Sequence, residues 1–360
     1  MTSPSSTPPV LVLTQGDPAG IGPEIVARVA LDAVSTPAPA WRPLMVVERA
    51  ALRPLEAALP DLAWDRLRPI RSGSHAEIAR ELAAVPAGEV PVLDPTDSPR
   101  QVTPGRPQPL DATAALAALD LGVALVRPNG GPAVGDALVT APLSKIEIAR
   151  HVAPDFRGHT DHLAQRAGLA RYGRDYLMTF LAPDLRVALL STHRPLDAAI
   201  AHVRRETVLE ALLCLHRHLG AAAGPIAVAG LDPHAGEGGL LGTADAEHVR
   251  PAVEEARRRG LDVCGPESAD SLFARARAGE FRWVLALYHD QGLIAVKTAA
   301  FGQATNWTLG LPYLRTSVDH GTAYELAGRG LARVDSLRAV ISETLRLVTL
   351  RPEKAGDRVL

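Results

Sequence analysis

The sequence is short of several residue types and patterns, and each shortage argues against a class of protein. Cys214 and Cys264 are the only cysteines and form no CxxC pair, which fits a reducing compartment and argues against a cysteine-based metal site. The net charge is -2 with no run of five like charges, so neither nucleic acid nor an acidic membrane is an expected partner. Residues 1–9 lack the basic and apolar stretches of a secretory signal, and no apolar run reaches the ~18 residues of a membrane span. We therefore expect a cytoplasmic protein.

Lysine is scarce as well. Among 38 basic residues only Lys145, Lys297 and Lys354 are lysines, so the chain strongly prefers arginine. A lysine that persists inside a motif can mark a position that needs a compact ammonium charge, which a planar guanidinium does not replace. For Lys145, just past a predicted strand, the alternative is an ordinary solvated surface side chain.

The usual dinucleotide fingerprint GxGxxG is also missing. In its place the segment TQGDPAGIGPEI follows a predicted strand at 10–13 and precedes a helix at 25–34. Its glycines permit a sharp turn, and Pro23 suits a first helical turn whose free N–H groups could face an anion. The alternative is a glycine-rich turn that only packs.

Strands and helices alternate along most of the 360 residues, which predicts an α/β protein with a doubly wound parallel sheet. A hairpin is expected at 176–180 and 187–190, and the segment 129–135 is the expected hinge. Residues 85–108 read as proline-rich connectors. Further strands are predicted at 44–47, 137–140, 226–230 and 283–287, and further helices at 49–59, 74–84, 112–126, 200–219, 246–260 and 332–350.

Three histidines follow three apolar strands. VALLSTH delivers His193, IAVAGLDPH delivers His234, and WVLALYHDQG delivers His289. Ligands bind beyond the carboxyl ends of strands in open α/β sheets, so these side chains are candidates for a catalytic tri-histidine metal site. Zinc is the natural ion, with magnesium, cobalt or manganese as alternatives. The competing interpretation is three strand-end histidines bonded to nearby backbone.

Other candidates lie at predicted helix starts and in polar loops. The segment 157–168 looks like the start of a helix, and Thr160 could cap it. His159 would then lie where an anion binds. Asp270 could cap the helix at 271–278 or point into a cleft. Asn306, Arg315 and nearby Lys297 supply an amide, a guanidinium and an ammonium, which suit a phosphorylated, carboxylated substrate.

Eight motifs, taken in order, closely resemble the 4-hydroxythreonine-4-phosphate dehydrogenase family of vitamin B6 biosynthesis, over residues 10 to 345. They are TQGDPAGIGPEI, VTAPLSK, GHTDHLA, STHRPL, GLDPHAGEGG, ESADSLF, YHDQGLIAVK and TNWTLGLPYLRTSVDHGTAYELAGRG.

The resemblance implies two α/β/α domains of the isocitrate and isopropylmalate dehydrogenase type, with a cleft between them. We expect a disordered tail at 1–9, a first domain at 10–135 plus 295–360 on the NAD side, and a second domain at 136–294 with the metal ligands and dimer interface. The family is homodimeric with shared active sites. The implied ligands and contacts are His193, His234 and His289 for the metal, His159, Thr160, Lys297, Asn306 and Arg315 for the substrate, and His320, Gly321 and Thr322 for NAD.

The implied reaction is NAD-dependent oxidation of the C3 hydroxyl of 4-phosphooxy-L-threonine, followed by loss of CO2 to give 3-amino-2-oxopropyl phosphate. Lys297 would supply positive charge, and Asp270 or Asp290 would handle the proton or hold a ligand imidazole in its tautomer.

Three residues depart from the common family pattern and put the substrate in doubt more than the chemistry. They are Ser144 in APLSK, Asp161 after GHT and Asp232 in GLDPH. The same chemistry on D-threonate or D-erythronate 4-phosphate is therefore the first alternative. A tri-histidine metal-dependent hydrolase and a non-catalytic phosphate-binding module are alternatives from other classes, and both predict no formation of NADH.

Overall fold

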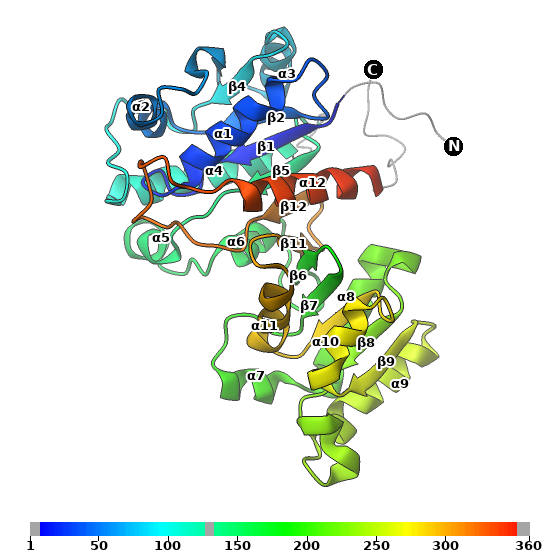
Figure 1. Ribbon diagram of the computed structural model, residues 1–360. Coiled ribbons are helices and arrows are strands. Elements are labelled where there is room, and N and C mark those ends of the chain that lie inside the picture. Colours follow the sequence, from blue (N-terminus) through cyan, green and yellow to red (C-terminus); the bar gives the residue numbers. More distant parts are fainter. Residues whose placement is uncertain (1–7, 127–132, 351–360) are drawn as a thin grey trace. The chain divides into compact units, whose positions relative to one another are not determined.

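The computed structural model describes residues 8–126 and 133–350 (Figure 1). Internal contacts divide the chain into two units, which we call unit 1, up to Leu163 and from Pro312 onward, and unit 2, Ala164–Leu311. The predicted crossings after residues 135 and 294 differ from these limits because β5 (Ala137–Thr140) pairs in parallel with β1 (Val10–Thr14) of unit 1, and β11 (Thr305–Leu309) pairs with β6 (Leu177–Ala182) of unit 2. The predicted tail and hinge lie mainly in 1–7 and 127–132, outside the described residues.

Unit 1 is built on six parallel strands in the order β3-β4-β2-β1-β5-β12. Its helices cover the sheet, with α1 against β2, α4 against β1 and β5, and α12 against β12. The remaining elements are β2 Arg42–Val46, β3 Leu67–Ile70, β4 Val90–Leu93, β12 Leu314–Ser317, α1 Gly22–Val34, α2 Arg49–Ala58, α3 His75–Ala84, α4 Pro109–Val126, α5 Lys145–His151, α6 His159–Arg166 at the unit boundary, and α12 Asp335–Leu350.

Unit 2 has a mixed sheet in the order β11-β6-β7-β10-β8-β9. The strands β6 (Leu177–Ala182) and β7 (Leu185–Leu189) form the predicted hairpin, whereas β7, β10, β8 and β9 run parallel. Other elements are β8 Ile226–Ala229, β9 Val263–Glu267, β10 Trp283–Ala286, β11 Thr305–Leu309, α7 Leu196–His202, α8 Arg205–Leu219, α9 Arg250–Arg258, α10 Ala269–Arg277 and α11 His289–Ala300.

Five strands, β3, β4, β9, β11 and β12, are not predicted from the sequence, and in β3 and β4 the signal against a strand is an internal proline. Proline lacks an N–H for the ladder and so counts against a central strand. Pro69 lies in β3, which is the edge strand of unit 1, and Pro91 of β4 precedes the pairs Met45–Val92 and Val46–Leu93 with β2. Both positions tolerate a missing donor.

Helix 200–219 was predicted as one element, but the structure has α7 and α8 with a break at Val203 and Arg204. The Thr207 hydroxyl accepts a bond of 3.1 Å from the Arg204 N–H and donates one of 2.7 Å to the His202 carbonyl. These side-chain bonds satisfy backbone groups at the break, which allows a second helix to start there.

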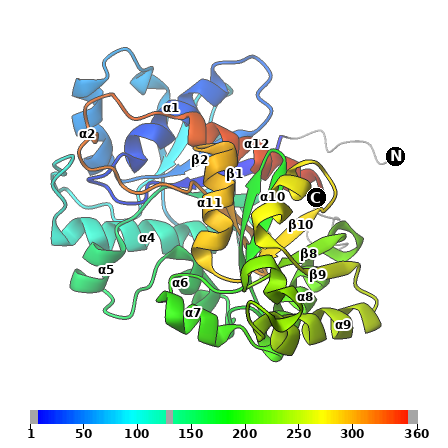
Figure 2. The ribbon, with the colours of Figure 1, turned by 60° about the horizontal axis from the view of Figure 1, so that its bottom comes forward.

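Helix α4 is long and apolar enough, by length and composition alone, to cross a membrane, which the sequence reading did not anticipate. It packs on β1 and β5 of unit 1 and lies beside α5 (Figure 2). Gly122 in its middle allows close approach, since a Cβ there would lie 2.6 Å from Cγ2 of Thr14. A helix buried in this way has the character of a core helix.

Candidate active site

The predicted site residues are distributed over both units. In unit 1 lie His159 and Thr160 at the start of α6, Arg315 in β12, and His320, Gly321 and Thr322 after β12. In unit 2 lie His193 after β7, His234 after β8, Asp270 in α10, His289, Asp290 and Lys297 in α11, and Asn306 in β11. Each unit therefore has a polar cluster of its own.

The three candidate metal ligands follow neighbouring strands of the unit 2 sheet. Strand β10 pairs in parallel with β7 on one side and β8 on the other, so the carboxyl ends of all three strands meet at one edge. The rings of His193 and His289 face each other there with centroids 5.1 Å apart. Strand position alone therefore predicted the edge of the sheet to which these histidines belong.

Two carboxylates adjoin these histidines. Nδ1 of His289 lies 2.7 Å from Oδ1 of Asp290, and the Ser268 hydroxyl donates a bond of 2.7 Å to Asp270 while lying 3.4 Å from Nδ1 of His234. The Ser268 hydroxyl and the backbone bonds at the start of α10 hold the pKa of Asp270 below its usual range. Asp290 is thus placed to orient the ring of His289 directly, and Asp270 acts on His234 through Ser268, which leaves Nε2 of both rings available.

Two expected helix caps were wrong. Asp270 was expected to precede its helix, but α10 begins at Ala269 and Ser268 occupies the capping position. Likewise α6 begins at His159, so Thr160 lies within the first turn. Asx and hydroxyl residues are good sequence signals for a helix start, but they locate it only to within a residue or two.

His234 lies in a loop of unusual backbone conformation. Residues from His234 to Gly238 all have positive φ, including non-glycine values of 53° at His234 and 41° at Glu237. Left-handed conformations of non-glycine residues are strained and concentrate at functional sites. The buried Asp245 carboxylate holds the loop entry, accepting bonds of 2.9 Å from the Leu231 N–H and 2.8 Å from the Asp232 N–H.

Two positioning residues were not predicted from the sequence. The Ser191 hydroxyl donates a bond of 3.1 Å to the Leu287 carbonyl, which ties the end of β7 to β10. The Gln291 amide accepts from the Leu287 N–H at 2.7 Å and donates to the Gly230 carbonyl at 2.8 Å, which ties β10 to β8. Ser191 belongs to the motif STH and Gln291 to the motif HDQG, and these motifs are the only sequence signal for either residue.

No group of three His, Cys, Asp or Glu side chains in residues 8–126 and 133–350 is arranged to hold a metal ion. The structure brings His193 and His289 together, and His234 belongs to no such group of three.

The remaining substrate candidates of unit 2 are Lys297 and Asn306. Lys297 is half-buried near the middle of α11. Asn306 pairs with Phe180 in the antiparallel ladder between β11 and β6, and its Oδ1 is buried with no hydrogen-bond partner within the described chain. A buried acceptor without a protein partner is costly, and a donor on a ligand would satisfy it.

In unit 1, Arg315 is a buried cation. Its side chain is 1% exposed, and its Nη2 donates a bond of 2.7 Å to the Thr140 hydroxyl on the paired strand β5. Burial lowers the pKa of Arg315 to about 9. Desolvation of this kind is offset when an anionic ligand binds.

His159 is held neutral beside that arginine. Burial lowers its pKa well below the usual value, and the positive charges of Arg315 and Lys145 lower it further. Its Nε2 is buried and makes no hydrogen bond within the described chain. A neutral imidazole offers one donor without adding charge, which suits an oxyanion ligand.

The candidate NAD loop packs against the glycine-rich turn TQGDPAGIG. The Ile21 N–H donates a bond of 3.0 Å to the Thr322 carbonyl, and the Tyr324 hydroxyl donates one of 2.5 Å to the buried Asp17 carboxylate. Burial raises the pKa of Asp17. A Cβ on Gly321 would meet no atom within 4 Å, so this loop is open where a ligand could approach.

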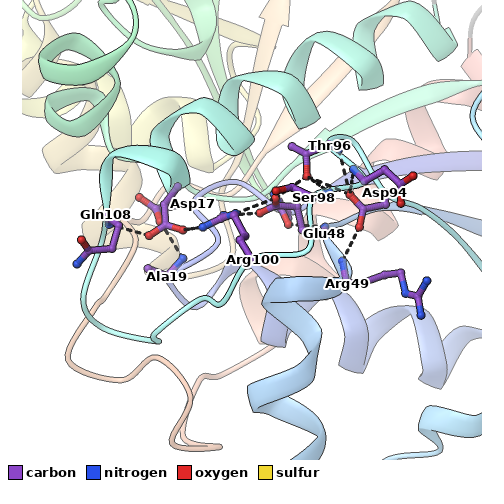
Figure 3. A network of polar contacts seen from close by, with 12 residues as sticks. Asp17, Ala19, Glu48, Arg49, Asp94, Thr96, Ser98, Arg100 and Gln108 are labelled. Carbon is purple, nitrogen blue, oxygen red and sulfur yellow. Dashed lines mark hydrogen bonds and ion pairs between the residues drawn. The ribbon is translucent and has the colours of Figure 1, made fainter.

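A buried ionic network supports the segment between β4 and α4, which adjoins the glycine-rich turn (Figure 3). Arg100 donates bonds of 2.5 Å to Glu48 and 2.6 Å to Asp111, and both carboxylates are fully or almost fully buried. The Gly105 N–H then donates a bond of 2.7 Å to the Ala19 carbonyl of the glycine-rich turn. The network thereby fixes the segment between β4 and α4 against that turn.

Solved structures with this α/β fold define the class of the chain. The 4-hydroxythreonine-4-phosphate dehydrogenase of Klebsiella pneumoniae matches with a TM-score of 0.79 and 31% identity, covering 94% of this chain and 99% of its own. A terephthalate 1,2-cis-dihydrodiol dehydrogenase of Burkholderia xenovorans matches with a TM-score of 0.60 and 25% identity, covering 95% and 98%. Both relatives are named as dehydrogenases.

Sequence comparison identifies the family. The family model described as pyridoxal phosphate biosynthetic protein PdxA matches residues 40–344. The 4-hydroxythreonine-4-phosphate dehydrogenase of Chromobacterium violaceum is 38% identical over 359 residues, which cover 97% of this chain and 99% of that protein. The chain belongs to the PdxA family, and the predicted family resemblance and α/β class are confirmed.

Proposed function

We propose that the chain catalyses the NAD-dependent oxidation of 4-phosphooxy-L-threonine to 2-amino-3-oxo-4-phosphooxybutanoate, which loses CO2 to give 3-amino-2-oxopropyl phosphate. This step would serve pyridoxal phosphate biosynthesis in the cytoplasm. The observation that carries the proposal is that His193, His234 and His289 follow three adjacent parallel strands at one edge of the unit 2 sheet. Relatives of nearly the same length that carry the corresponding dehydrogenase name support it.

The histidines fit a divalent cation, preferably zinc, in a homodimer. The carboxylate contact at Nδ1 of His289 leaves its Nε2 as the ligand atom, as does the Ser268 contact for His234. Because the described part of one chain forms no group of three ligands, one histidine would come from the partner subunit. When bound, the cation supplies positive charge beside the reacting oxygen of the substrate.

Residues of the family motifs would bind the substrate and the cofactor. Lys297, Asn306, His159, Thr160 and Arg315 would contact the substrate, and His320, Gly321 and Thr322 would contact NAD. In the oxidation, the C3 hydroxyl loses its proton and the C3 hydrogen leaves as hydride to NAD+. The C1–C2 bond then breaks, CO2 departs, and the electron pair passes to the C3 carbonyl before a proton is taken up.

The carboxylates accept protons or orient rings in this scheme. Because the pKa of Asp270 is held below its usual range, the group is ionised at neutral pH and cannot donate a proton there. Its charge acts on His234 through the shared neighbour Ser268. We assign Asp290 the same orienting role toward His289.

Two of the three departures from the family pattern have local roles. The Ser144 hydroxyl accepts the Glu147 N–H at 3.3 Å and so caps α5, and the Asp232 carboxylate accepts the Ala244 N–H at 3.3 Å. These bonds account for both residues without a change of substrate. Oxidation of D-threonate or D-erythronate 4-phosphate is the second candidate, favoured by the same residues that would bind phosphate and carboxylate.

The test compares NADH formation with 4-phosphooxy-L-threonine and with D-erythronate 4-phosphate, each with and without added zinc. We expect zinc-dependent NADH formation with the first substrate and a kcat/KM at least tenfold lower with the second. The reverse preference would replace the proposed substrate by the sugar acid. Absence of NADH with both would contradict a dehydrogenase and favour the hydrolase.

Shared active sites are tested by mixing two inactive variants. His193→Ala and His234→Ala should each abolish activity, and subunit exchange between them should restore part of it if His234 comes from the partner subunit. No recovery, with heterodimers demonstrated by differential tagging, would show that His193 and His234 of one site belong to the same chain.

A further inference from the structure

Lys145 is the first residue of α5 and follows β5, on which Thr140 meets Arg315. Its aliphatic stem lies against the backbone at Gly158, where a Cβ would be 2.8 Å from Cε and 3.4 Å from Nζ of Lys145. The next residue along the chain is His159, whose ring experiences the positive charge of Lys145. Two separate motifs, APLSK and GHT, thus bring the ammonium group to the imidazole.

Charged and neutral groups meet in this cluster. Lys145 and Arg315 are cations and His159 is neutral, while Nε2 of His162 contacts Asp120 at 2.8 Å. Asp161 is a carboxylate that acts on Lys145. Surrounding atoms lower the pKa of Lys145, although the side chain remains accessible to solvent. Lys145 and Arg315 thus bring two positive charges to the cluster, and the exposed ammonium group is reachable by a ligand.

We propose that Lys145 is an additional substrate-binding residue, which with Arg315 binds the phosphate group of the substrate. A phosphate monoester carries a charge of about −1.5 to −2 at neutral pH, whereas a carboxylate carries only one. Two cations with neutral donors from His159 and Thr160 match the phosphate better in charge and in number of acceptor oxygens.

The scarcity of lysine in this chain agrees with that role. Lys145 is one of three lysines among 38 basic residues. The stem passes close to a glycine backbone, and an ammonium group is more compact than a guanidinium. An arginine at position 145 would place a bulkier, planar group beside Gly158.

This inference rests on the proposed function for the identity of the substrate, and binding measurements separate the two. Isothermal titration calorimetry of the metal-loaded protein would use 4-phosphooxy-L-threonine, unphosphorylated 4-hydroxy-L-threonine and inorganic phosphate. Lys145→Met should weaken binding of the first and third ligands about tenfold or more and leave the second within about twofold. Lys145→Arg should recover less than half of the lost affinity on a logarithmic scale.

Arg150→Met is the matched control, because it removes one positive charge from the exposed side of the same helix. It should leave all three affinities unchanged, and circular dichroism should show the native fold in every variant. Unchanged affinity of Lys145→Met for inorganic phosphate and the phosphorylated ligand would overturn the proposal, as would equal weakening for all ligands. Phosphate binding that depends on Lys145 without NAD reduction would contradict the proposed function and leave this inference standing.

Discussion

The candidate clusters of the two units differ in how completely one chain builds them. In unit 1, Arg315 is 1% exposed and bonded to Thr140, and a neutral His159 lies beside it. In unit 2, the side chains of His289 and Asp290 are 31% and 72% exposed. The first cluster is preformed inside the fold, whereas the second lies on loops and helix starts beyond the sheet.

This difference follows from where the side chains stand relative to the strands. Arg315 is inside β12, paired with β5, so the sheet itself buries it. The histidines of unit 2 come after their strands have ended, where the sheet can align them but cannot enclose them. On our proposal a site of the second kind is completed by a cation and a second subunit, so its function would be more easily lost than its fold.

The largest effect is expected from removing a histidine of the open cluster. His289→Ala should lower kcat/KM about a hundredfold or more, because the charge of a bound cation contributes several kcal/mol to the stabilisation of the transition state. NADH absorbance and metal content by mass spectrometry would be measured together. His216→Ala, on the exposed face of α8, is the control and should change neither. Full activity of His289→Ala would remove the metal site from the scheme.

A smaller effect is expected from the carboxylate that orients His289. Asp290→Asn should weaken zinc binding about 10-fold to 100-fold, because the bond to Nδ1 fixes the ring for coordination through Nε2. Competition with a chelator of known affinity would measure it. The exposed Asp197→Asn in the first turn of α7 serves as the control. Equal zinc affinity in wild type and Asp290→Asn would mean that Asp290 has no orienting role.

The contacts that align the strand ends should affect stability more than chemistry. Gln291→Leu leaves the Leu287 N–H and the Gly230 carbonyl without their partner, which should cost about 1–3 kcal/mol in the free energy of unfolding. Urea denaturation would measure this change. Gln303→Leu, at an exposed position of the same unit, should cost less than half as much. If the two variants were equally stable, Gln291 would not hold the strand ends together.

The buried cluster of unit 1 should make the free energy of unfolding depend on pH. The folded protein keeps the pKa of His159 well below its usual value, so below pH ~6.5 the unfolded chain binds a proton that the folded chain does not. The contribution of His159 to the free energy of unfolding is fully present above that pH. It decreases by about 1.4 kcal/mol for each pH unit as the pH falls below it. His159→Gln should remove this slope relative to wild type between pH 6.5 and about 5.5 in urea denaturation.

His216→Gln is the control for that measurement and should keep the wild-type slope, because its side chain is exposed. An identical slope in wild type and His159→Gln would show that His159 takes up its proton in the folded protein. The buried character of the unit 1 cluster would then be wrong, and the comparison between the two units would lose its basis.

The sequence predicted much of this architecture because the relevant signals are local. Apolar runs at 10–13, 137–140 and 283–287 correspond to β1, β5 and β10 to within one residue at each end. The three histidines were located by their position after strands, and the structure confirms that those strands are parallel neighbours. The proline-containing strands β3 and β4 were missed because their tolerance of proline depends on which neighbours they pair with.

By itself, then, the sequence determined the α/β class, the family and the residues worth considering, since periodicity, strand ends and motif order are properties of the chain read in one dimension. Tertiary structure alone decided which of those residues meet. Lys145 and His159 come together with Arg315, far along the chain, and Gln291 reaches Gly230, because parallel strands bring remote segments side by side. Burial and neighbouring charge determine the protonation state of His159, and both exist only once that packing has formed.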